Sequence, residues 1–155
     1  MNMISIALYQ PDIPQNAGNI LRLAACLGLT AHVVGPAGFD ISDRSLRRAG
    51  MDYLQMVEIV RHVDWNRFAA WRAANGGRLV LLTTRGATAY TDFAFTDDDI
   101  LLFGRESAGV PDTVHQAADA RLIVPMRPGL RSLNVASTAA MVAGEALRQT
   151  GGFAA

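Results

Sequence analysis

The sequence predicts an α/β domain with a mainly parallel sheet flanked by helices. Short apolar runs typical of buried strands alternate along the chain with helical patterns, and this alternation favours parallel strands joined through helices. The length of 155 residues fits one domain around a single core. Half of the residues are hydrophobic and 18% are charged, a composition that argues against a disordered chain. We therefore expect residues 1–155 to form a single domain.

Six short runs rich in apolar and β-branched residues predict the strands. The first run ends at Pro11 and Pro14, because proline cannot donate a hydrogen bond to a strand ladder. The stretch 85–99 is polar and rich in turn residues, and no strand is expected in it. The strands are expected at residues 3–9, 31–34, 56–60, 79–83, 100–103 and 122–124.

Capping residues and glycines predict the ends of the helices. Asn16 is expected to cap a helix that continues through Leu27 and stops at Gly28. Asp64 opens a helix that ends at the Asn-Gly-Gly of residues 75–77. Further helices are expected after Ser42 or Asp43, from Pro111, and over residues 132–149.

The overall charge does not indicate a polyanionic partner, because the formal net charge is zero and the pI is about 6.8. Every basic residue other than histidine is an arginine, which reflects either genome composition or a use of bidentate phosphate contacts. Cys26, the only cysteine, excludes intramolecular disulfides, and its apolar neighbours predict a buried side chain. The chain has no signal-like start and no apolar stretch of the ~20 residues that span a bilayer. We expect a cytoplasmic protein.

The usual glycine signature of nucleotide-binding folds is missing. The turn after the first strand, residues 10–19, contains one glycine, and neither G-x-G-x-x-G nor a Walker sequence occurs. Glycines follow strands late in the chain instead, at Gly104, Gly109 and Gly129. The sequence therefore predicts a ligand site built by the C-terminal half.

Three segments could carry chemistry. The first, residues 15–22, places Asn16, Asn19 and Arg22 at the mouth of a helix, where free N–H groups attract anions; an N-cap followed by a surface arginine is the alternative. The second, 103–111, is a strand exit with two glycines, or an ordinary loop. The third, 124–137, sets two arginines and a glycine before an alanine-rich helix that also suits the core.

Taken together, these segments resemble the SPOUT superfamily of RNA methyltransferases. Within it they are most similar to the small branch that 2′-O-methylates the wobble nucleotide of tRNA. The resemblance rests on LYQPDIPQNAGNILR at 8–22, LLFGRESAGVP at 101–111 and IVPMRPGLRSLN at 123–134, supported by GF with LRRAGMDY within 38–53 and by LTTRG at 82–86. It covers nearly the whole chain in order. Two places depart from the family pattern, namely residues 135–139 and Gly144 in the last helix.

The resemblance implies a C-terminal trefoil knot, which sequence patterns alone would not suggest because knots are rare. It also implies that S-adenosyl-L-methionine (SAM) binds within the knot, mainly through backbone groups. The positions that match the family's cofactor contacts are Leu82, Gly104, Val124 and Ser132. Neighbours expected to line the pocket are Thr83, Glu106, Gly109, Met126, Leu133 and Asn134.

The resemblance further implies a homodimer, with the RNA site at the subunit interface and the first and last helices as the natural contact elements. Arg22 matches the arginine of the family's first motif. It is expected to orient the ribose 2′-OH rather than act as a simple base, since the arginine pKa exceeds ~12. Asn16 and Asn19 would help to place the nucleotide. Phosphate contacts with the tRNA anticodon stem-loop are expected from arginines that could equally be solvated: Arg44, Arg47, Arg48, Arg127 and Arg131.

No metal requirement is expected. His32, His62 and His115 are far apart in sequence, His32 is interpreted as structural, and the acidic run 97–99 is interpreted as a solvated turn. Three other functions remain open at this point. They are 2′-O-methylation of ribosomal RNA, non-catalytic RNA binding by the same fold, and a nucleotide-dependent oxidoreductase, which the absent glycine fingerprint disfavours.

Overall fold

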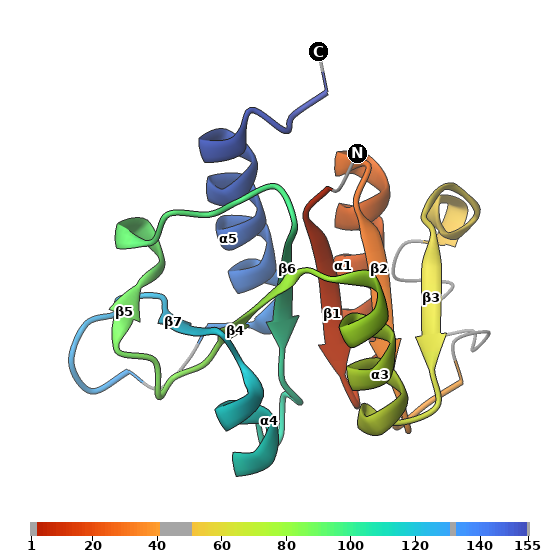
Figure 1. Cartoon of the computed structure of the whole chain (residues 1–155), viewed down its shortest axis with the longest axis horizontal. Helices are drawn as coiled ribbons and strands as arrows, with labels where there is room; N and C mark the ends of the chain where they lie inside the picture. The colour runs from red at the N-terminus through yellow and green to blue at the C-terminus, as the bar shows by residue number, and fades with distance from the viewer. Residues whose placement is uncertain (1–2, 41–50, 131–132, 155) are drawn as a thin grey trace.

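Parallel strands form one continuous sheet in the computed structural model, which describes residues 3–40, 51–130 and 133–154 (Figure 1). Within these residues the sheet has seven strands in the order β3-β2-β1-β6-β4-β7-β5, and every neighbouring pair is parallel. The strands are β1 (Ser5–Tyr9), β2 (Thr30–Val34), β3 (Ile59–His62), β4 (Arg78–Leu82), β5 (Thr88–Ala89), β6 (Asp99–Phe103) and β7 (Ala120–Ile123).

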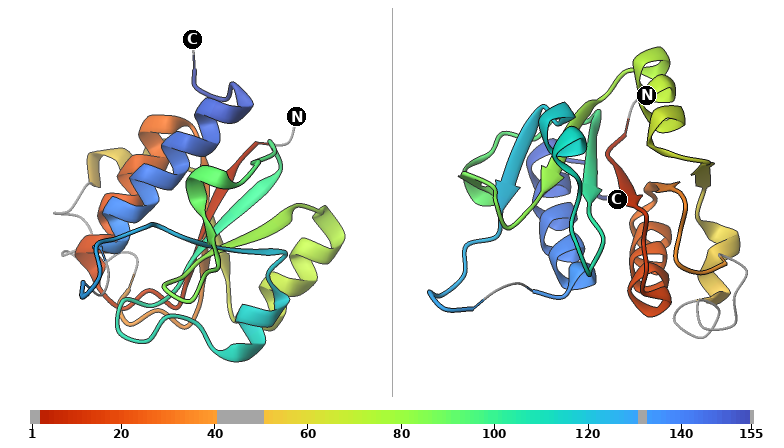
Figure 2. Two further views of the ribbon diagram at one scale, coloured as in Figure 1. Left: turned by 90° about the vertical axis from the view of Figure 1, so that its left-hand side faces the viewer. Right: turned by 90° about the horizontal axis from the view of Figure 1, so that it is seen from below.

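Helices cover both faces of the sheet. Figure 2 shows α1 and α5 on one face and α3 and α4 on the other. Their bounds are α1 (Pro14–Leu27), α3 (Trp65–Asn75), α4 (Asp112–Ala117) and α5 (Val135–Thr150), with short 3₁₀ turns at η1 (Met51–Met56) and η2 (Tyr90–Asp92).

Two apolar layers hold the sheet and helices together. Side chains alternate along each strand, so Ile6 and Leu8 of β1 pack toward α1 and α5, whereas Ala7 and Tyr9 pack toward α3 and α4. The central strands β1 and β6 are buried along their whole length. This pattern is expected of parallel strands covered on both faces.

The order of the strands determines where a ligand can bind. From β1 the chain proceeds outward to β2 and β3, while β6 and β4 lie on the other side of β1. Open α/β sheets bind ligands at the carboxyl ends of strands beside such a reversal. The segments that leave β4, β6 and β7 meet at this edge.

The expected α/β class with a parallel sheet is confirmed. Several details of the sequence interpretation are wrong. The polar stretch 85–99 contains the two-residue strand β5, and the third strand begins at Ile59 rather than at 56, because η1 occupies the preceding residues. The last helix begins at Val135, after Asn134. The trefoil knot stays a prediction, and the helix expected after Ser42 or Asp43 lies outside the described residues.

Three side chains also differ from expectation. Asn16 is not the cap of the first helix: α1 begins at Pro14, and Asn16 lies buried in its first turn. Cys26 is exposed, because it points away from the sheet on α1. Asp99 is fully buried rather than solvated, since Arg78 donates to both of its carboxylate oxygens at 2.7 and 2.8 Å.

Candidate cofactor and substrate site

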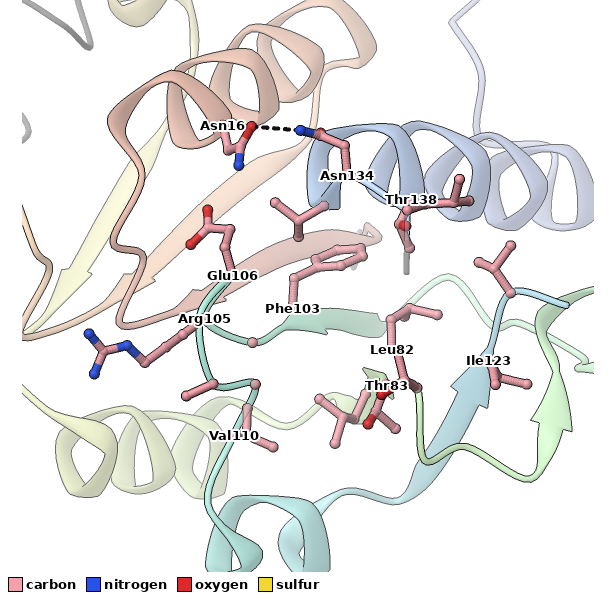
Figure 3. A pocket seen from close by; sticks show the side chains of 18 of the residues that line it. Asn16, Leu82, Thr83, Phe103, Arg105, Glu106, Val110, Ile123, Asn134 and Thr138 are labelled. Carbon is pink, nitrogen blue, oxygen red and sulfur yellow. Dashed lines mark hydrogen bonds between the residues drawn. The ribbon is translucent and has the colours of Figure 1, made fainter. Parts of the chain in front are cut away.

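A cavity of about 460 Å³ opens at the carboxyl edge of the sheet, between the exits of β4, β6 and β7 and the start of α5 (Figure 3). Its volume lies within the range of small-molecule sites. Its wall combines apolar side chains with polar ones and with the backbone of glycines. The lining residues come from α1 (Asn16), from β4 and its exit (residues 81–84), from β6 and its exit (103–110), from residues 123, 124 and 126, and from residues 133–135 and 138.

The loop after β6 is closed by two backbone hydrogen bonds. Arg105 N donates to Gly109 O at 3.0 Å, and Gly109 N donates to Arg105 O at 2.8 Å. A Cβ on Gly104 would lie 2.7 Å from the carbonyl carbon of Gly109, and Gly109 itself has a φ of +64°. Both positions therefore require glycine, which explains the spacing of the second motif.

The loop after β4 is attached to β7. Thr83 N donates to Leu122 O at 2.9 Å, and Gly86 N donates to Thr83 O at 3.1 Å. A Cβ on Gly86 would lie 2.5 Å from the carbonyl carbon of Leu122. The absence of a side chain at Gly86 thus lets this loop lie flat against the strand that forms the adjacent wall.

Asn134 joins the first and third motifs at the cavity. Its Oδ1 accepts hydrogen bonds from Ala136 N at 2.8 Å and Ser137 N at 3.3 Å, which caps α5. Its Nδ2 donates to Asn16 Oδ1 at 2.9 Å, the bond dashed in Figure 3. One side chain therefore holds the start of α5 and the start of α1 together.

An acidic pair lies at the loop side of the cavity. Asp12 N donates to Glu106 Oε2 at 3.3 Å, and Ser107 Oγ donates to Asp12 Oδ2 at 2.5 Å. Arg105 Nη2 lies 3.7 Å from the same Asp12 oxygen, and Arg105 Nη1 donates to Gln10 Oε1 at 3.2 Å. Burial and the hydrogen bond to Asp12 raise the pKa of Glu106. The hydrogen bond to Glu106, followed by Ser107 and Arg105, lowers the pKa of Asp12 against the opposing effect of burial.

The structure brings together all the described residues that the resemblance assigned to the cofactor. Those lining the cavity are Leu82, Thr83, Gly104, Glu106, Gly109, Val124, Met126, Leu133 and Asn134. Ser132 lies outside the described residues. Sequence reasoning did not assign the remaining lining residues, which are Leu81, Thr84, Phe103, Arg105, Ser107, Ala108, Val110, Ile123, Val135 and Thr138. Each is within four residues of an assigned position, so proximity in sequence was the only available signal.

Of the residues expected to act on RNA, Asn16 lines the cavity, and the other described ones lie elsewhere. Arg22 and Asn19 are exposed on α1, and neither lines the cavity. The guanidinium carbon of Arg22 lies 4.7 Å from the ring centroid of Tyr53 in η1, a cation–π contact that the sequence did not reveal. Arg127 is exposed beyond β7. The remaining expected phosphate contacts, Arg44, Arg47, Arg48 and Arg131, lie outside the described residues.

The cavity fits a nucleoside cofactor held mainly by backbone. Glycines at Gly104 and Gly109 leave loop N–H and C=O groups free of side-chain cover, and apolar side chains such as Leu82 and Ile123 suit the faces of an aromatic base. Glu106 contributes an acidic side chain to the wall. A SAM-sized ligand matches this combination better than a polyphosphate, which would call for a glycine-rich cradle with a lysine.

Comparisons with known proteins agree with this geometry. The model of the family described as SpoU rRNA Methylase matches residues 3–144. A protein of Beijerinckia indica named tRNA (cytidine(34)-2'-O)-methyltransferase is 62% identical over 149 residues, covering 96% of this chain and 93% of that protein. A solved structure concerning 2-OH methylation of C/U34 on tRNA superposes with a TM-score of 0.90 at 40% identity, covering 96% of each chain. The SpoU methyltransferase AviRb of Streptomyces viridochromogenes, in complex with AdoMet, superposes with a TM-score of 0.87 at 30% identity, covering 96% of this chain and 60% of that one.

Proposed function

The chain belongs to the SpoU rRNA Methylase family, and we propose that it transfers a methyl group from SAM to the ribose 2′-OH of nucleotide 34 of tRNA, a cytidine or a modified uridine. The observation that carries this proposal is the 62% identity, over nearly the full length of both proteins, to an enzyme named for that reaction. The residues of the second and third motifs that resemble the SPOUT pattern converge on one cavity, as such an enzyme requires.

Ribosomal RNA is the less favoured substrate. This chain spans 57% of a solved rRNA methyltransferase of Sinorhizobium meliloti, whereas it spans 93% of the Beijerinckia protein and 96% of the chain solved for C/U34 methylation. Similarity in length and identity thus both point toward the tRNA branch of the family.

Positioning dominates the chemistry that the protein must supply. SAM carries its methyl group on a sulfonium, which is a good leaving group, so the attacking oxygen has to be brought into line with it. The closed loop between Gly104 and Gly109 and the Asn134 cap fix the cavity walls before any ligand arrives. Pre-formed walls reduce the entropy lost on binding and hold the reacting groups in register.

Arg22 is assigned to the nucleotide. Its cationic guanidinium can hold a phosphate and the 2′ oxygen and stabilise the negative charge that develops there. The ring of Tyr53, at 4.7 Å, restrains the arginine without neutralising it. Asn19, exposed three residues earlier on the same face of α1, offers amide groups to the same nucleotide.

We assign a homodimer because the single chain separates Arg22 from the cavity. Large apolar side chains are left exposed around α1 and α5: Ile13, Leu133 and Met141 are 42%, 41% and 42% exposed. Exposed apolar side chains at these helices suit a protein contact. Packing of α1 and α5 against a second copy would cover it and would bring Arg22 of one subunit to the cavity of the other. Sedimentation velocity at micromolar concentration should give the mass of a dimer, and a monomer would contradict the assignment.

Contacts with tRNA phosphates are assigned to Arg127, Arg131 and the cluster Arg44, Arg47 and Arg48. Binding should weaken steeply between 50 and 200 mM salt, at roughly 0.9 log units per phosphate contact for each log unit of salt. In the described part of the chain, no helix is long and apolar enough to cross a membrane. Because the proposed substrate is tRNA, we assign the protein to the cytoplasm.

Mapping of ribose methylation at single-nucleotide resolution tests the proposed function. Total tRNA from cells with and without the gene should differ at position 34 of a subset of tRNAs, and purified protein with SAM should restore that methyl group in unmodified transcripts or in tRNA from the deletion strain. Loss of a 2′-O-methyl group from ribosomal RNA, with position 34 unchanged, would contradict the proposal.

A further inference from the structure

A buried carboxylate oxygen beside the cavity has no hydrogen-bond donor among the described residues. It is Oδ1 of Asp12, two residues before α1. The other oxygen, Oδ2, accepts from Ser107 and faces Arg105. A buried acceptor left without a donor is destabilising, so an unpaired Oδ1 calls for an explanation.

Glu106 can supply the missing donor. Glu106 lies directly beside Asp12, since Asp12 N donates to Glu106 Oε2 at 3.3 Å, and each carboxyl group shifts the pKa of the other. Two ionised carboxylates at such a distance repel each other, whereas a single proton between them makes a strong hydrogen bond.

Few other charges act on the pair. Arg105 is the charged group that faces Asp12 from the loop after β6. From the segment after β2, Gly38 packs on Asp12 with no side chain, and Gly38 N donates to Pro11 O at 2.9 Å. From α1 and α5, the nearby cavity residues Asn16 and Asn134 are uncharged. Since Arg105 lies on the Asp12 side, the proton belongs on Glu106.

We propose that Asp12 and Glu106 share one proton, carried by Glu106 and donated to Asp12 Oδ1, and that this protonated pair fixes the loop leading into α1 to the wall of the cofactor cavity. Asp12 is then a positioning residue. It acts through Glu106 and through the start of α1, which carries Arg22. The inference rests on the proposed methyl transfer for its functional consequence, but the shared proton itself does not depend on the reaction.

The electrostatics of the pair agree with this arrangement. Burial and Asp12 raise the pKa of Glu106, while Glu106, Ser107 and Arg105 lower that of Asp12. The proton is therefore held by Glu106 to a higher pH than in an ordinary glutamic acid. Above that pH the pair becomes doubly negative and the loops separate.

Carbon-13 NMR of the side-chain carboxyls gives a direct test without any substrate. In the wild-type protein Glu106 should titrate above the ordinary value of 4.5. In Asp12→Asn the amide can donate to an ionised Glu106, so the titration should move down, to or below that ordinary value. Asp97→Asn, on an exposed turn, is the matched control and should leave the Glu106 titration in place. The shared proton is contradicted if Glu106 in the wild type titrates at or below the ordinary value of 4.5. It is also contradicted if the Glu106 titration does not change in Asp12→Asn.

The kinetic test uses Glu106→Gln, whose amide donates to Asp12 Oδ1 and cannot ionise. The ratio of kcat for this variant to kcat for the wild type should rise with pH, by up to about tenfold per pH unit above the Glu106 pKa. Forming a ratio cancels any pH dependence that both proteins share, and a merely structural role of the side chain would leave it flat. A flat or falling ratio therefore overturns the positioning role. If the wild type transfers no methyl group, the proposed function is wrong, but the NMR titration still tests whether Asp12 and Glu106 share a proton.

Discussion

The cofactor cavity and the surface around Arg22 differ in how completely one chain builds them. The cavity is enclosed by segments from five parts of the sequence, with hydrogen bonds such as Arg105–Gly109 and Asn134–Asn16 among them. Arg22, in contrast, is exposed on α1, and the contact that the structure describes for its guanidinium is with Tyr53. One region is walled in by the chain itself, whereas the other lies exposed on a helix.

This difference separates cofactor binding from methyl transfer. A change in the cavity should weaken SAM binding first, and a change at Arg22 should impair transfer while leaving SAM binding intact. The following predictions probe that separation.

Replacement of Arg22 should have the largest effect. Arg22→Ala removes the group assigned to the 2′ oxygen, and loss of such a stabilising interaction costs on the order of 10²–10³ in kcat. The SAM dissociation constant by calorimetry should stay within about twofold of wild type. Arg22→Lys keeps the charge but not the planar fork, and should recover part of the rate. Wild-type turnover in Arg22→Ala would remove Arg22 from the reaction.

Replacement of Gly104 should weaken SAM binding, the property that Arg22→Ala leaves intact. In Gly104→Ala the added Cβ would meet the backbone of Gly109 at 2.7 Å, so the loop must move and the cavity wall with it. SAM affinity should fall at least about tenfold, which corresponds to roughly 1.4 kcal/mol. Gly144→Ala, whose Cβ would meet nothing within 4 Å among the described residues apart from the backbone of its own helix, is the control. Equal SAM affinities for the two variants would show that the loop does not form the site.

Asn134→Ala should have a smaller, mixed effect. It removes the cap of α5, worth about 1 kcal/mol, and the hydrogen bond to Asn16, worth about another 1 kcal/mol. Urea unfolding should show a loss of roughly 2 kcal/mol, and SAM affinity should fall several-fold. Ser137→Ala, in the same first turn, should leave both the free energy of unfolding and the SAM affinity unchanged. Unchanged unfolding of Asn134→Ala would contradict its bridging role.

Changes on the face of the sheet that α3 covers should affect neither the cavity nor the surface around Arg22. Under α3, His32 Nδ1 lies 3.0 Å from His62 Nε2, and burial followed by the charge of His62 lowers the pKa of His32 to about 4. Below pH 6.5 the unfolded chain therefore binds a proton at His32 that the folded chain does not bind. The free energy of unfolding should accordingly fall by on the order of 2 kcal/mol between pH 6.5 and 4.

His32→Gln tests that assignment. The variant should lose most of this acid sensitivity in urea titrations at successive pH values, while SAM affinity and kcat at pH 7.5 stay as in the wild type. An unchanged pH dependence would contradict the assignment to His32. A change in SAM affinity would break the separation of the two faces.

The sequence was most informative where local chemistry decides the structure. The end of α1 at Gly28, the Asp64 cap and the glycines at Gly104 and Gly109 follow from backbone conformation and hydrogen bonding near in sequence. Interactions between distant segments could not be predicted in this way. Asn16 was interpreted as a cap because its partner Asn134 lies 118 residues away.

The same limit applies to charge and aromatic contacts. His32 and His62 are 30 residues apart, and their stacking depends on the pairing of β2 with β3. Asp99 was interpreted as solvated because its partner Arg78 belongs to the adjacent strand β4. The assignment of the cavity residues required the family resemblance, because the sequences of the loops alone do not identify a ligand.

Complementation in a mixed dimer tests the central claim most directly. Arg22→Ala subunits keep a complete cavity, and Gly104→Ala subunits keep Arg22. If Arg22 serves the partner's cavity, a heterodimer isolated with two affinity tags contains one intact site, and should show about half of the wild-type activity at SAM concentrations below saturation of the defective cavity. If Arg22 acts on the cavity of its own chain, each subunit of the heterodimer is defective, and activity no higher than that of the two parent homodimers would contradict the account.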